Sequence, residues 1–265
     1  MSWSWDPMLY EGSARFYARG RMPYPQSLAD ALRDELALDG TGRLLDVGCG
    51  PASLTIVLAS LFAEVIGIDA DAGMVGEASR RAPGNATFRR LRAEELPADL
   101  GTFDVVTFAQ SFHWMEQMRV AVTVRTMLRP GGAYVGVGAT THQGDGNVPR
   151  EAIKELIRSY LGPERRAGQS TVPDDGPPWH GREALGAAGF GKPREIPVPA
   201  GRTHERSEDD IVASVFSQSS SAPHLFGGRL DEFERDLRTL LRAHAPADGY
   251  RERVHDMTLL VARRD

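Results

Sequence analysis

Short apolar runs alternate with stretches of helical periodicity in the first half of the chain. Residues 53–61 carry apolar side chains at helical spacing, and 115–128 predicts a second helix that Pro130 and two glycines end. Runs rich in Val, Ile, Leu or Phe predict strands at about 43–47, 64–69, 87–91, 103–109 and 133–138. Strands and helices that alternate in this way predict a parallel α/β sheet with helices on both faces.

The pattern changes after Gly138. Residues 139–150 and 163–182 are rich in Gly, Pro and Asp and predict loops, whereas 150–161 and 229–244 predict helices. The second half therefore carries long insertions between its regular elements.

Three further elements complete the prediction. Ser207 is followed by three acidic residues, which indicates the capped start of another helix. Apolar segments at 193–198 and 254–262 predict two late strands. Before the first strand, residues 10–38 predict helix that is interrupted by two prolines.

Composition narrows the class of protein. The 265 residues are 41% hydrophobic, enough for one sizeable core, so we expect a single elaborated domain over 1–265. The net charge is −5 and no long block of one sign occurs, so the chain lacks the basic footprint of a nucleic-acid binder.

The chain offers no sign of export or of membrane insertion. Its single cysteine, Cys49, excludes an intramolecular disulfide and favours a reducing compartment. Neither a signal peptide nor an apolar stretch of membrane-spanning length is found. We therefore expect a cytoplasmic protein without a membrane partner, while its oligomeric state stays open.

The most informative motif is a strand, a glycine turn, a helix and a second strand that ends on a carboxylate. It runs from Arg43 through Gly48 and Gly50 to Asp69. Glycines let the backbone approach a ligand closely, because they carry no Cβ. A carboxylate roughly 20 residues past such a turn can accept hydrogen bonds from ribose hydroxyls. The motif predicts a nucleoside-sized cleft at the carboxyl ends of parallel strands.

Two features of this motif disfavour a nicotinamide dinucleotide. The third glycine of the dinucleotide fingerprint is missing, and Ser53 follows the turn instead. Asp46, just before the first glycine, would repel a diphosphate and would suit a cationic group such as an ammonium or a sulfonium.

Four segments together resemble one family. Leu44 to Gly50 resembles the first motif of class I S-adenosylmethionine-dependent methyltransferases, and Gly67 to Asp69 resembles their acidic second motif. Ala93 to Pro97 and Leu128 to Gly132 are similar to the third motif and to the turn before the fifth strand. The order and spacing match over about 43–138, with the greatest likeness to the small-molecule branch.

The resemblance implies a fold and a division of the chain. The fold is a Rossmann-like seven-stranded, mostly parallel sheet with helices on both faces, a last strand that is antiparallel between its neighbours, and a helical cap. Within the single domain we expect four parts: an N-terminal helical lid at 1–40, a donor-binding core at 41–138, a cap and substrate region with the sixth strand at 139–245, and the last strand at 246–265.

The resemblance also implies which residues hold S-adenosylmethionine. Asp46 would lie near the ammonium, Asp69 would hold the ribose, and Met74 would pack on the adenine. Many relatives carry Asp where this chain has Arg92, so Glu94 is the expected partner of the adenine amino group. The full set expected at the donor is Tyr17, Arg21, Asp46, Gly48, Cys49, Gly50, Asp69, Ala70, Met74, Ala93, Glu94 and Gln110.

The end of the fourth strand, at 109–114, is where the acceptor would meet the methyl group. DNA amino-methylating relatives carry Asn or Asp before a Pro-Pro-aromatic run here; this chain lacks that run, so a nucleic-acid base is not expected as the substrate. Metal-dependent catechol-type relatives carry a ligating Asp here, which Gln110 does not replace, so no metal is expected. His113 is the candidate base or acceptor-orienting group, with a structural histidine as the alternative. Tyr24, Trp114 and His142 are expected on the substrate side.

The resulting hypothesis is metal-independent methyl transfer to a small organic acceptor. The enzyme would act mainly by aligning the acceptor and excluding water, because a sulfonium donor is already activated. Methylation of oxygen, nitrogen or carbon stays open. The alternatives are a nicotinamide-dependent oxidoreductase, which uses a similar cleft, and a protein that binds the donor without turnover.

Overall fold

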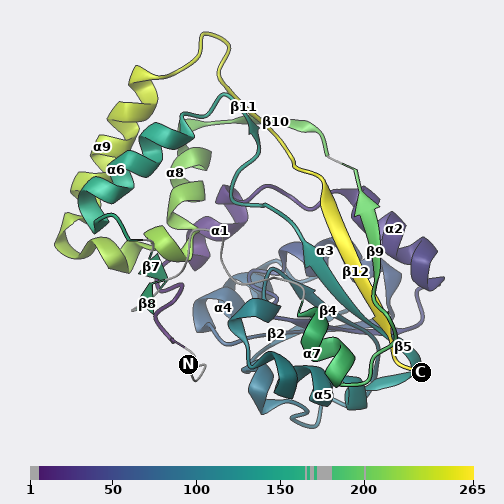
Figure 1. Cartoon of the computed structure of the whole chain (residues 1–265). Helices are drawn as coiled ribbons and strands as arrows, with labels where there is room; N and C mark the ends of the chain where they lie inside the picture. The colour runs from purple at the N-terminus through teal and green to yellow at the C-terminus, as the bar shows by residue number, and fades with distance from the viewer. Residues whose placement is uncertain (1–5, 165, 168–169, 172–180, 200) are drawn as a thin grey trace.

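A seven-stranded sheet organises the computed structural model, which describes residues 6–164, 166–167, 170–171, 181–199 and 201–265 (Figure 1). Its strand order is β3-β2-β1-β4-β5-β12-β9. The strands are β1 (Arg43–Val47), β2 (Glu64–Asp69), β3 (Ala86–Arg90), β4 (Phe103–Ala109), β5 (Leu128–Gly138), β9 (Arg194–Val198) and β12 (Met257–Arg263). The first five are parallel, and β12 runs antiparallel to both β5 and β9. The predicted sheet with its antiparallel last strand is confirmed.

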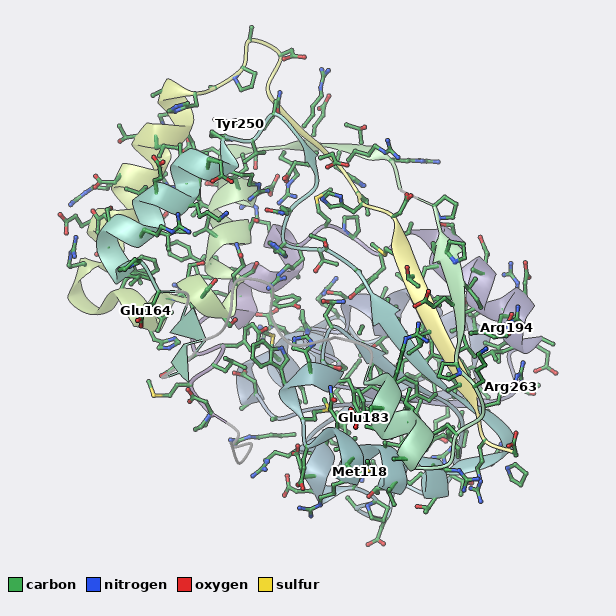
Figure 2. All side chains as sticks on the ribbon, in the orientation of Figure 1. Met118, Glu164, Glu183, Arg194, Tyr250 and Arg263 are labelled. Carbon is green, nitrogen blue, oxygen red and sulfur yellow. The ribbon has the colours of Figure 1, made fainter. Side chains whose placement is uncertain are left out.

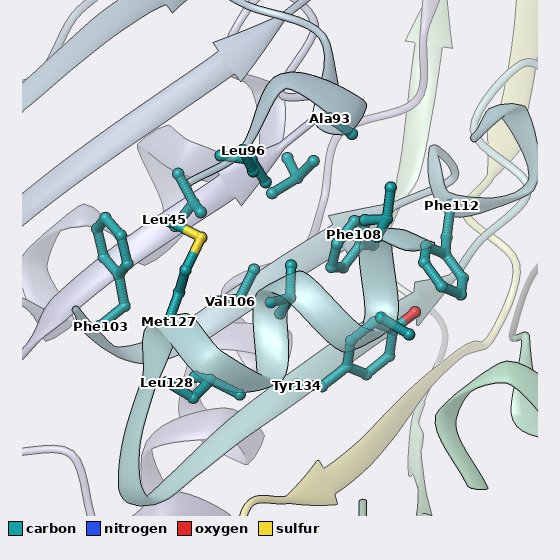
Figure 3. Packing of buried hydrophobic residues seen from close by; sticks show 14 of the residues in the cluster. Leu45, Ala93, Leu96, Phe103, Val106, Phe108, Phe112, Met127, Leu128 and Tyr134 are labelled. Carbon is teal, nitrogen blue, oxygen red and sulfur yellow. The ribbon is translucent and has the colours of Figure 1, made fainter. Parts of the chain in front are cut away.

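Side chains of the strands point alternately into two apolar cores, as the pleat requires. Leu45 faces the core that α5 (Gln117–Met127) and α7 (Arg182–Ala187) cover, where Phe108, Phe112 and Tyr134 cluster (Figure 3). Leu44 faces the opposite core, which α2 (Gln26–Leu36) and α3 (Ser53–Leu58) cover. The helix α4 (Ala72–Arg80) contacts β2 and β3.

A helical layer stands apart from the large sheet (Figure 1). It combines α1 (Ala14–Gly20) with α6 (Arg150–Leu161), α8 (Glu208–Phe216) and α9 (Leu230–Ala243). These helices enclose a third apolar core, in which Phe216, Phe226 and Phe233 pack ring against ring. The helix α1 precedes β1 in the chain but packs on α8, so the N-terminal segment and the later insertions share one layer.

A second, three-stranded sheet that the sequence did not predict connects this layer to the rest. Its order is β10 (Thr203–Arg206), β11 (Tyr250–Arg253) and β6 (Asp145–Gly146). Tyr250, labelled in Figure 2, is buried and donates its hydroxyl to the Leu241 carbonyl of α9.

A buried ion cluster holds this junction together. The Glu252 carboxylate, fully shielded from solvent, pairs with Arg150 and Arg206 and accepts the N–H of Gly144. Arg206 also donates to the Gly20 carbonyl, at 2.9 Å. The cluster therefore ties together the N-terminal segment, the connection after β5 and the small sheet.

The short elements account for most differences from the predicted boundaries. The helix predicted from 115 begins at Gln117, because the backbone of Met115 is extended after a 3-10 turn at 112–114. The fifth strand begins at Leu128 rather than 133, and the third lies one residue earlier than predicted. The 3-10 helices are η1 (Ala59–Leu61), η2 (Ala93–Glu95), η3 (Phe112–Trp114), η4 (Ser219–Ser221) and η5 (Pro223–Arg229).

The loop predicted at 163–182 lies largely outside the described residues. In its described part, β7 (Arg166–Ala167) pairs with β8 (Ser170–Thr171), and α7 begins at Arg182, where no helix was predicted. Across the described ranges, no helix is both long and apolar enough to span a bilayer.

Candidate functional site

Two adjoining pockets open at the carboxyl ends of β1, β2 and β4. The larger encloses about 670 Å³, counting space that is open to solvent, and the smaller about 360 Å³. Tyr17, Gly48, Gly50 and Ala109 line both, so the two pockets adjoin, and together they are called the cleft. A cleft at this edge of a parallel sheet is the expected place for a ligand.

The glycine turn between β1 and α3 forms the floor of the cleft. Gly48 and Gly50 both adopt left-handed backbone conformations, with φ of +68° and +54°. A Cβ on Gly48 would lie 2.5 Å from the Cβ of Ser111, whereas a Cβ on Gly50 would meet nothing within 4 Å. Gly48 is therefore required for packing as well as for conformation, and Gly50 leaves open space beside the cleft.

Asp69, at the end of β2, joins the turn to the larger pocket. Its carboxylate accepts the N–H of Gly50 at 2.8 Å and that of Asp71 at 2.9 Å. Burial raises the pKa of Asp69 to about 6, although both backbone donors lower it. Each carboxylate oxygen keeps a lone pair for a ligand hydroxyl in the pocket that Asp69 lines.

Asp46 lies behind the turn and not in the cleft. It is 1% exposed, and its carboxyl accepts hydrogen bonds from the hydroxyls of Thr55 at 2.6 Å and Thr107 at 2.8 Å. Burial raises its pKa, against the effect of these two donors. No basic side chain in the described part of the chain forms an ion pair with it. When ionised, Asp46 therefore carries a negative charge without an ion-pair partner in the described part of the chain, behind the glycine turn that lines both pockets.

The far end of the larger pocket is formed by α4 and η2. Met74 is 2% exposed, and its N–H is capped by the Asp71 carboxylate at 2.9 Å. On η2, Ala93 and Glu94 line the pocket beside Arg92. The Glu94 carboxylate is buried, and its second oxygen lies 3.6 Å from the Arg92 Nε. The apolar side chain of Met74 and the carboxylate of Glu94 thus both lie at this end of the larger pocket.

The N-terminal segment supplies the opposite wall with three long side chains. The Arg21 guanidinium lies 4.4 Å from the centre of the Tyr17 ring and donates to the Ser217 carbonyl at 2.6 Å. The Tyr10 phenol lies beside the Ser219 side chain, and burial raises its pKa to about 12. This wall is therefore attached to the loop that follows α8.

Most residues predicted for the site line the cleft. Those on the larger pocket are Tyr17, Gly48, Gly50, Asp69, Ala70, Met74, Ala93, Glu94, Gln110 and Trp114. The smaller pocket is lined by Arg21, Tyr24 and Cys49, together with shared residues. Burial raises the pKa of the Tyr24 phenol and of the Cys49 thiol, so both groups are neutral near pH 7.

Three predicted residues do not line either pocket: Asp46, His113 and His142. His113 lies in η3, where its ring packs against Trp114 with centroids 4.7 Å apart. The carbonyl of His142 accepts the Ser214 hydroxyl at 2.6 Å, on the side of the helical layer. His113 thus lies behind the lining of the larger pocket, in contact with Trp114, which does line it.

Sequence reasoning missed Tyr10, Ser111 and Met115, which line the larger pocket, and Thr141, which lines the smaller. Tyr10 shares the aromatic character of the N-terminal segment, which was the available signal. Ser111 and Met115 lie within or beside the run 109–114 that had been singled out. In the ranges that the structure describes, no group of three or more His, Cys, Asp or Glu side chains is arranged to hold a metal ion.

Comparisons with known proteins agree with this geometry. Residues 44–132 match the family described as a methyltransferase domain. An uncharacterized methyltransferase-like protein of Schizosaccharomyces pombe is 28% identical over 202 residues, which cover 76% of this chain and 74% of that protein. An uncharacterized methyltransferase of Mycobacterium tuberculosis is 34% identical over 128 residues, 48% of this chain and 51% of that protein.

Among solved structures, the fold is shared with the N-methyltransferase NodS of Bradyrhizobium japonicum, determined in complex with S-adenosylhomocysteine. The TM-score is 0.52 at 12% sequence identity, over 97% of this chain and 98% of that one. The likeness extends beyond the matched domain to nearly the whole length of both chains.

Proposed function

Because this chain is a class I S-adenosylmethionine-dependent methyltransferase, we propose that it methylates a small organic acceptor without a metal ion. The observation that carries this proposal is the covered cleft. Tyr10, Tyr17 and Arg21 form a wall over the glycine turn, and contacts to Ser217 and Ser219 hold that wall in place. A small molecule fits under such a wall, whereas a nucleic acid or a folded protein would have to displace it.

The residues present fit the donor in shape and charge. Asp69 is proposed to accept hydrogen bonds from the ribose hydroxyls, Met74 to pack on the adenine, and Ala93 to border its edge. Glu94 keeps a buried carboxylate oxygen that can accept from the adenine amino group. The open space beside Gly50 leaves room for the ligand along the backbone.

Two opposite charges suit the methionine portion. Asp46 has no counter-ion among the described residues, and a cationic group nearby would favour its ionised form. The Nε of Arg21 is buried and finds no hydrogen-bond partner in the described part of the chain. A carboxylate in the smaller pocket would satisfy that donor by a charge-assisted bond.

Bound S-adenosylmethionine supplies an electrophilic methyl group on a sulfonium. The protein then has to align the acceptor and exclude water, which Trp114, Tyr24 and the N-terminal wall are proposed to do. If the acceptor must lose a proton, His113 is the proposed base or orienting group, acting beside Trp114. His142 lines neither pocket, so it is proposed to contact the acceptor only where the acceptor extends toward α8.

The first test is calorimetric titration with S-adenosylmethionine and S-adenosylhomocysteine, with NAD as the control. We expect both sulfur nucleosides to bind and NAD not to bind. A panel of small hydroxyl-, amine- and carbanion-forming acceptors is then screened for S-adenosylhomocysteine release, beside duplex DNA, RNA and denatured protein. Turnover confined to a macromolecular acceptor would overturn the proposal.

His113→Ala separates the two roles of that residue. Loss of a proton-transfer or orienting group should lower turnover by about 10²-fold, while the calorimetric affinity for S-adenosylhomocysteine stays nearly unchanged. His244→Ala, at an exposed histidine of the helical layer, is the matched control. An equal loss of affinity and turnover would mean that His113 only supports the packing of Trp114.

A further inference from the structure

The segment 111–116, between β4 and α5, forms part of the cleft wall. Ser111, Trp114 and Met115 line the larger pocket. The segment is attached at both ends to elements of the proposed donor site rather than to the helical layer. This arrangement links the part of the cleft that would face the acceptor to the part that would hold the nucleoside.

The first attachment is a buried hydrogen bond from Ser111. Its hydroxyl donates to the carbonyl of Val47 at 2.6 Å, at the residue just before Gly48. Ser111 is 7% exposed, and its Cβ occupies the space that a side chain at Gly48 would need. Because the bond is shielded from water, a substitution that removes the Ser111 hydroxyl would leave the Val47 carbonyl without this donor and without water to replace it.

The second attachment runs through Glu94. Its carboxylate accepts the N–H of Glu116 at 3.0 Å, and its backbone carbonyl accepts from the Arg119 guanidinium at 2.9 Å. Glu94 is 7% exposed, so the bond to Glu116 is a charge-assisted bond in a poorly hydrated place. The side chain and the main chain of Glu94 thus both hold the start of α5. Glu116, which the side chain holds, comes two residues after Trp114.

We propose that Ser111 and Glu94 are positioning residues that fix Trp114 relative to the donor site, so that donor binding sets the acceptor wall. The proposal rests on the proposed function, because Glu94 would contact the adenine with one oxygen while it holds Glu116 with the other. A nucleoside on η2 therefore restrains 111–116 through a single side chain. The donor would bind first and the acceptor second.

The test uses Trp114 as the only tryptophan, with excitation that is selective for tryptophan. Trp3, Trp5 and Trp179 are replaced by Phe, and acrylamide quenching is measured with and without saturating S-adenosylhomocysteine. In the unliganded protein, Glu94→Ala should raise the quenching constant about twofold, because a released segment samples open states. Saturating ligand should protect Trp114 in the parent protein and much less in the variant. Glu94→Gln keeps an acceptor for the Glu116 N–H and should restore the parent quenching in the unliganded protein, but its single oxygen leaves no second acceptor for the adenine amino group, so protection by the ligand should stay weakened.

The matched control is Glu95→Ala. Glu95 is the neighbouring carboxylate of η2, but it accepts the N–H of Arg92 and makes no bond to 111–116. We expect the Glu95 variant to quench like the parent. If Glu94→Ala does not fold, Arg119→Gln and Ser111→Ala each cut one of the other attachments and should raise quenching by a smaller factor.

The quenching experiment distinguishes failure of this proposal from failure of the proposed function. Equal quenching of Trp114 in the parent, Glu94→Ala and Ser111→Ala proteins would overturn the proposal, as would equal effects of Glu94→Ala and Glu95→Ala. If S-adenosylhomocysteine does not bind the parent protein, the proposed function fails and so does the coupling to donor binding. The unliganded quenching series would then still report whether the two attachments hold the wall.

Discussion

The two walls of the cleft are built in different ways. On the sheet side, Gly48, Asp69 and Ser111 are held by bonds to main-chain groups of the strands and the glycine turn. On the opposite side, Tyr10 and Arg21 depend on contacts with residues that follow α8, about 200 positions later in the chain. The sheet-side wall is thus a local product of the strand ends, whereas the wall that contains Tyr10 and Arg21 depends on how the helical layer is attached.

The largest expected effect concerns that attachment. Glu252→Gln removes the buried charge that Arg150 and Arg206 share, and it leaves the buried Arg206 without its counter-ion. We expect a loss of about 3–5 kcal/mol in the free energy of unfolding, as for other broken buried ion pairs. Urea titration followed by circular dichroism measures it.

Glu205→Gln is the control for this change, since Glu205 lies exposed on the neighbouring strand β10. It should change stability by no more than about 0.5 kcal/mol. Equal effects of the two substitutions would show that the ion cluster does not stabilise the junction between the helical layer and the rest of the protein.

A matched pair of substitutions tests the sheet-side wall. Gly48→Ala places a methyl group against Ser111 and strains a left-handed residue, so we expect a loss of about 2–3 kcal/mol in stability. Gly50→Ala carries the conformational cost alone, on the order of 1 kcal/mol, because its Cβ would meet only open space. Thermal unfolding of both variants, beside the parent, measures the difference. A larger loss at Gly50 would contradict the packing argument.

The ionisation of Asp69 gives the sheet-side wall a pH dependence. Its folded-state pKa of about 6 lies above the ordinary aspartate value of 3.8, so its contribution to stability is fully present below pH 4 and is lost as the pH rises through about 6. Ligand binding runs the other way, because the ionised carboxylate is the better acceptor for ribose hydroxyls.

We expect the affinity for S-adenosylhomocysteine to rise about tenfold between pH 5 and pH 7.5, which corresponds to about 1.4 kcal/mol. Asp69→Asn should weaken binding by about 1–3 kcal/mol at pH 7.5 and should remove most of this dependence. Calorimetry at both pH values measures it. A variant with the pH profile of the parent would place the titrating group elsewhere.

The smallest expected effect lies beneath the cleft, in the aromatic cluster of Figure 3. The hydroxyl of Tyr134 is buried and has no hydrogen-bond partner among the described residues, and burial raises its pKa. Tyr134→Phe removes a polar group that is left unsatisfied, so stability should stay equal or rise by about 1 kcal/mol. A clear loss in urea titration would reveal a partner for this hydroxyl.

The sequence predicted the central strands well for a physical reason. Buried parallel strands are nearly continuous apolar runs, and β1, β2 and β4 end where the pattern predicted. The small sheet was missed because its strands are two to four residues long and polar, as Thr203–Arg206 shows. Strands of that kind carry no alternation that can be recognised.

The residues of the site also divide into those that the sequence predicts and those that it does not. Asp69 and the glycines occupy the cleft as their motif predicts, because backbone geometry fixes them. Asp46 belongs to the same motif, yet its side chain turns away toward Thr55 and Thr107. Nothing local in the sequence predicts that choice, nor the bond between Glu94 and Glu116, because each depends on a partner from another element.

The place of β12 has a consequence for how the protein is made. It lies between β5 and β9 and pairs with both, although it follows both in the chain. On the ribosome, β5 therefore emerges with one edge open and keeps it open until all of the helical layer and then β12 have been synthesised. Nascent chains of this protein pass through a long stage with an exposed apolar strand edge, which is the kind of surface that chaperones bind.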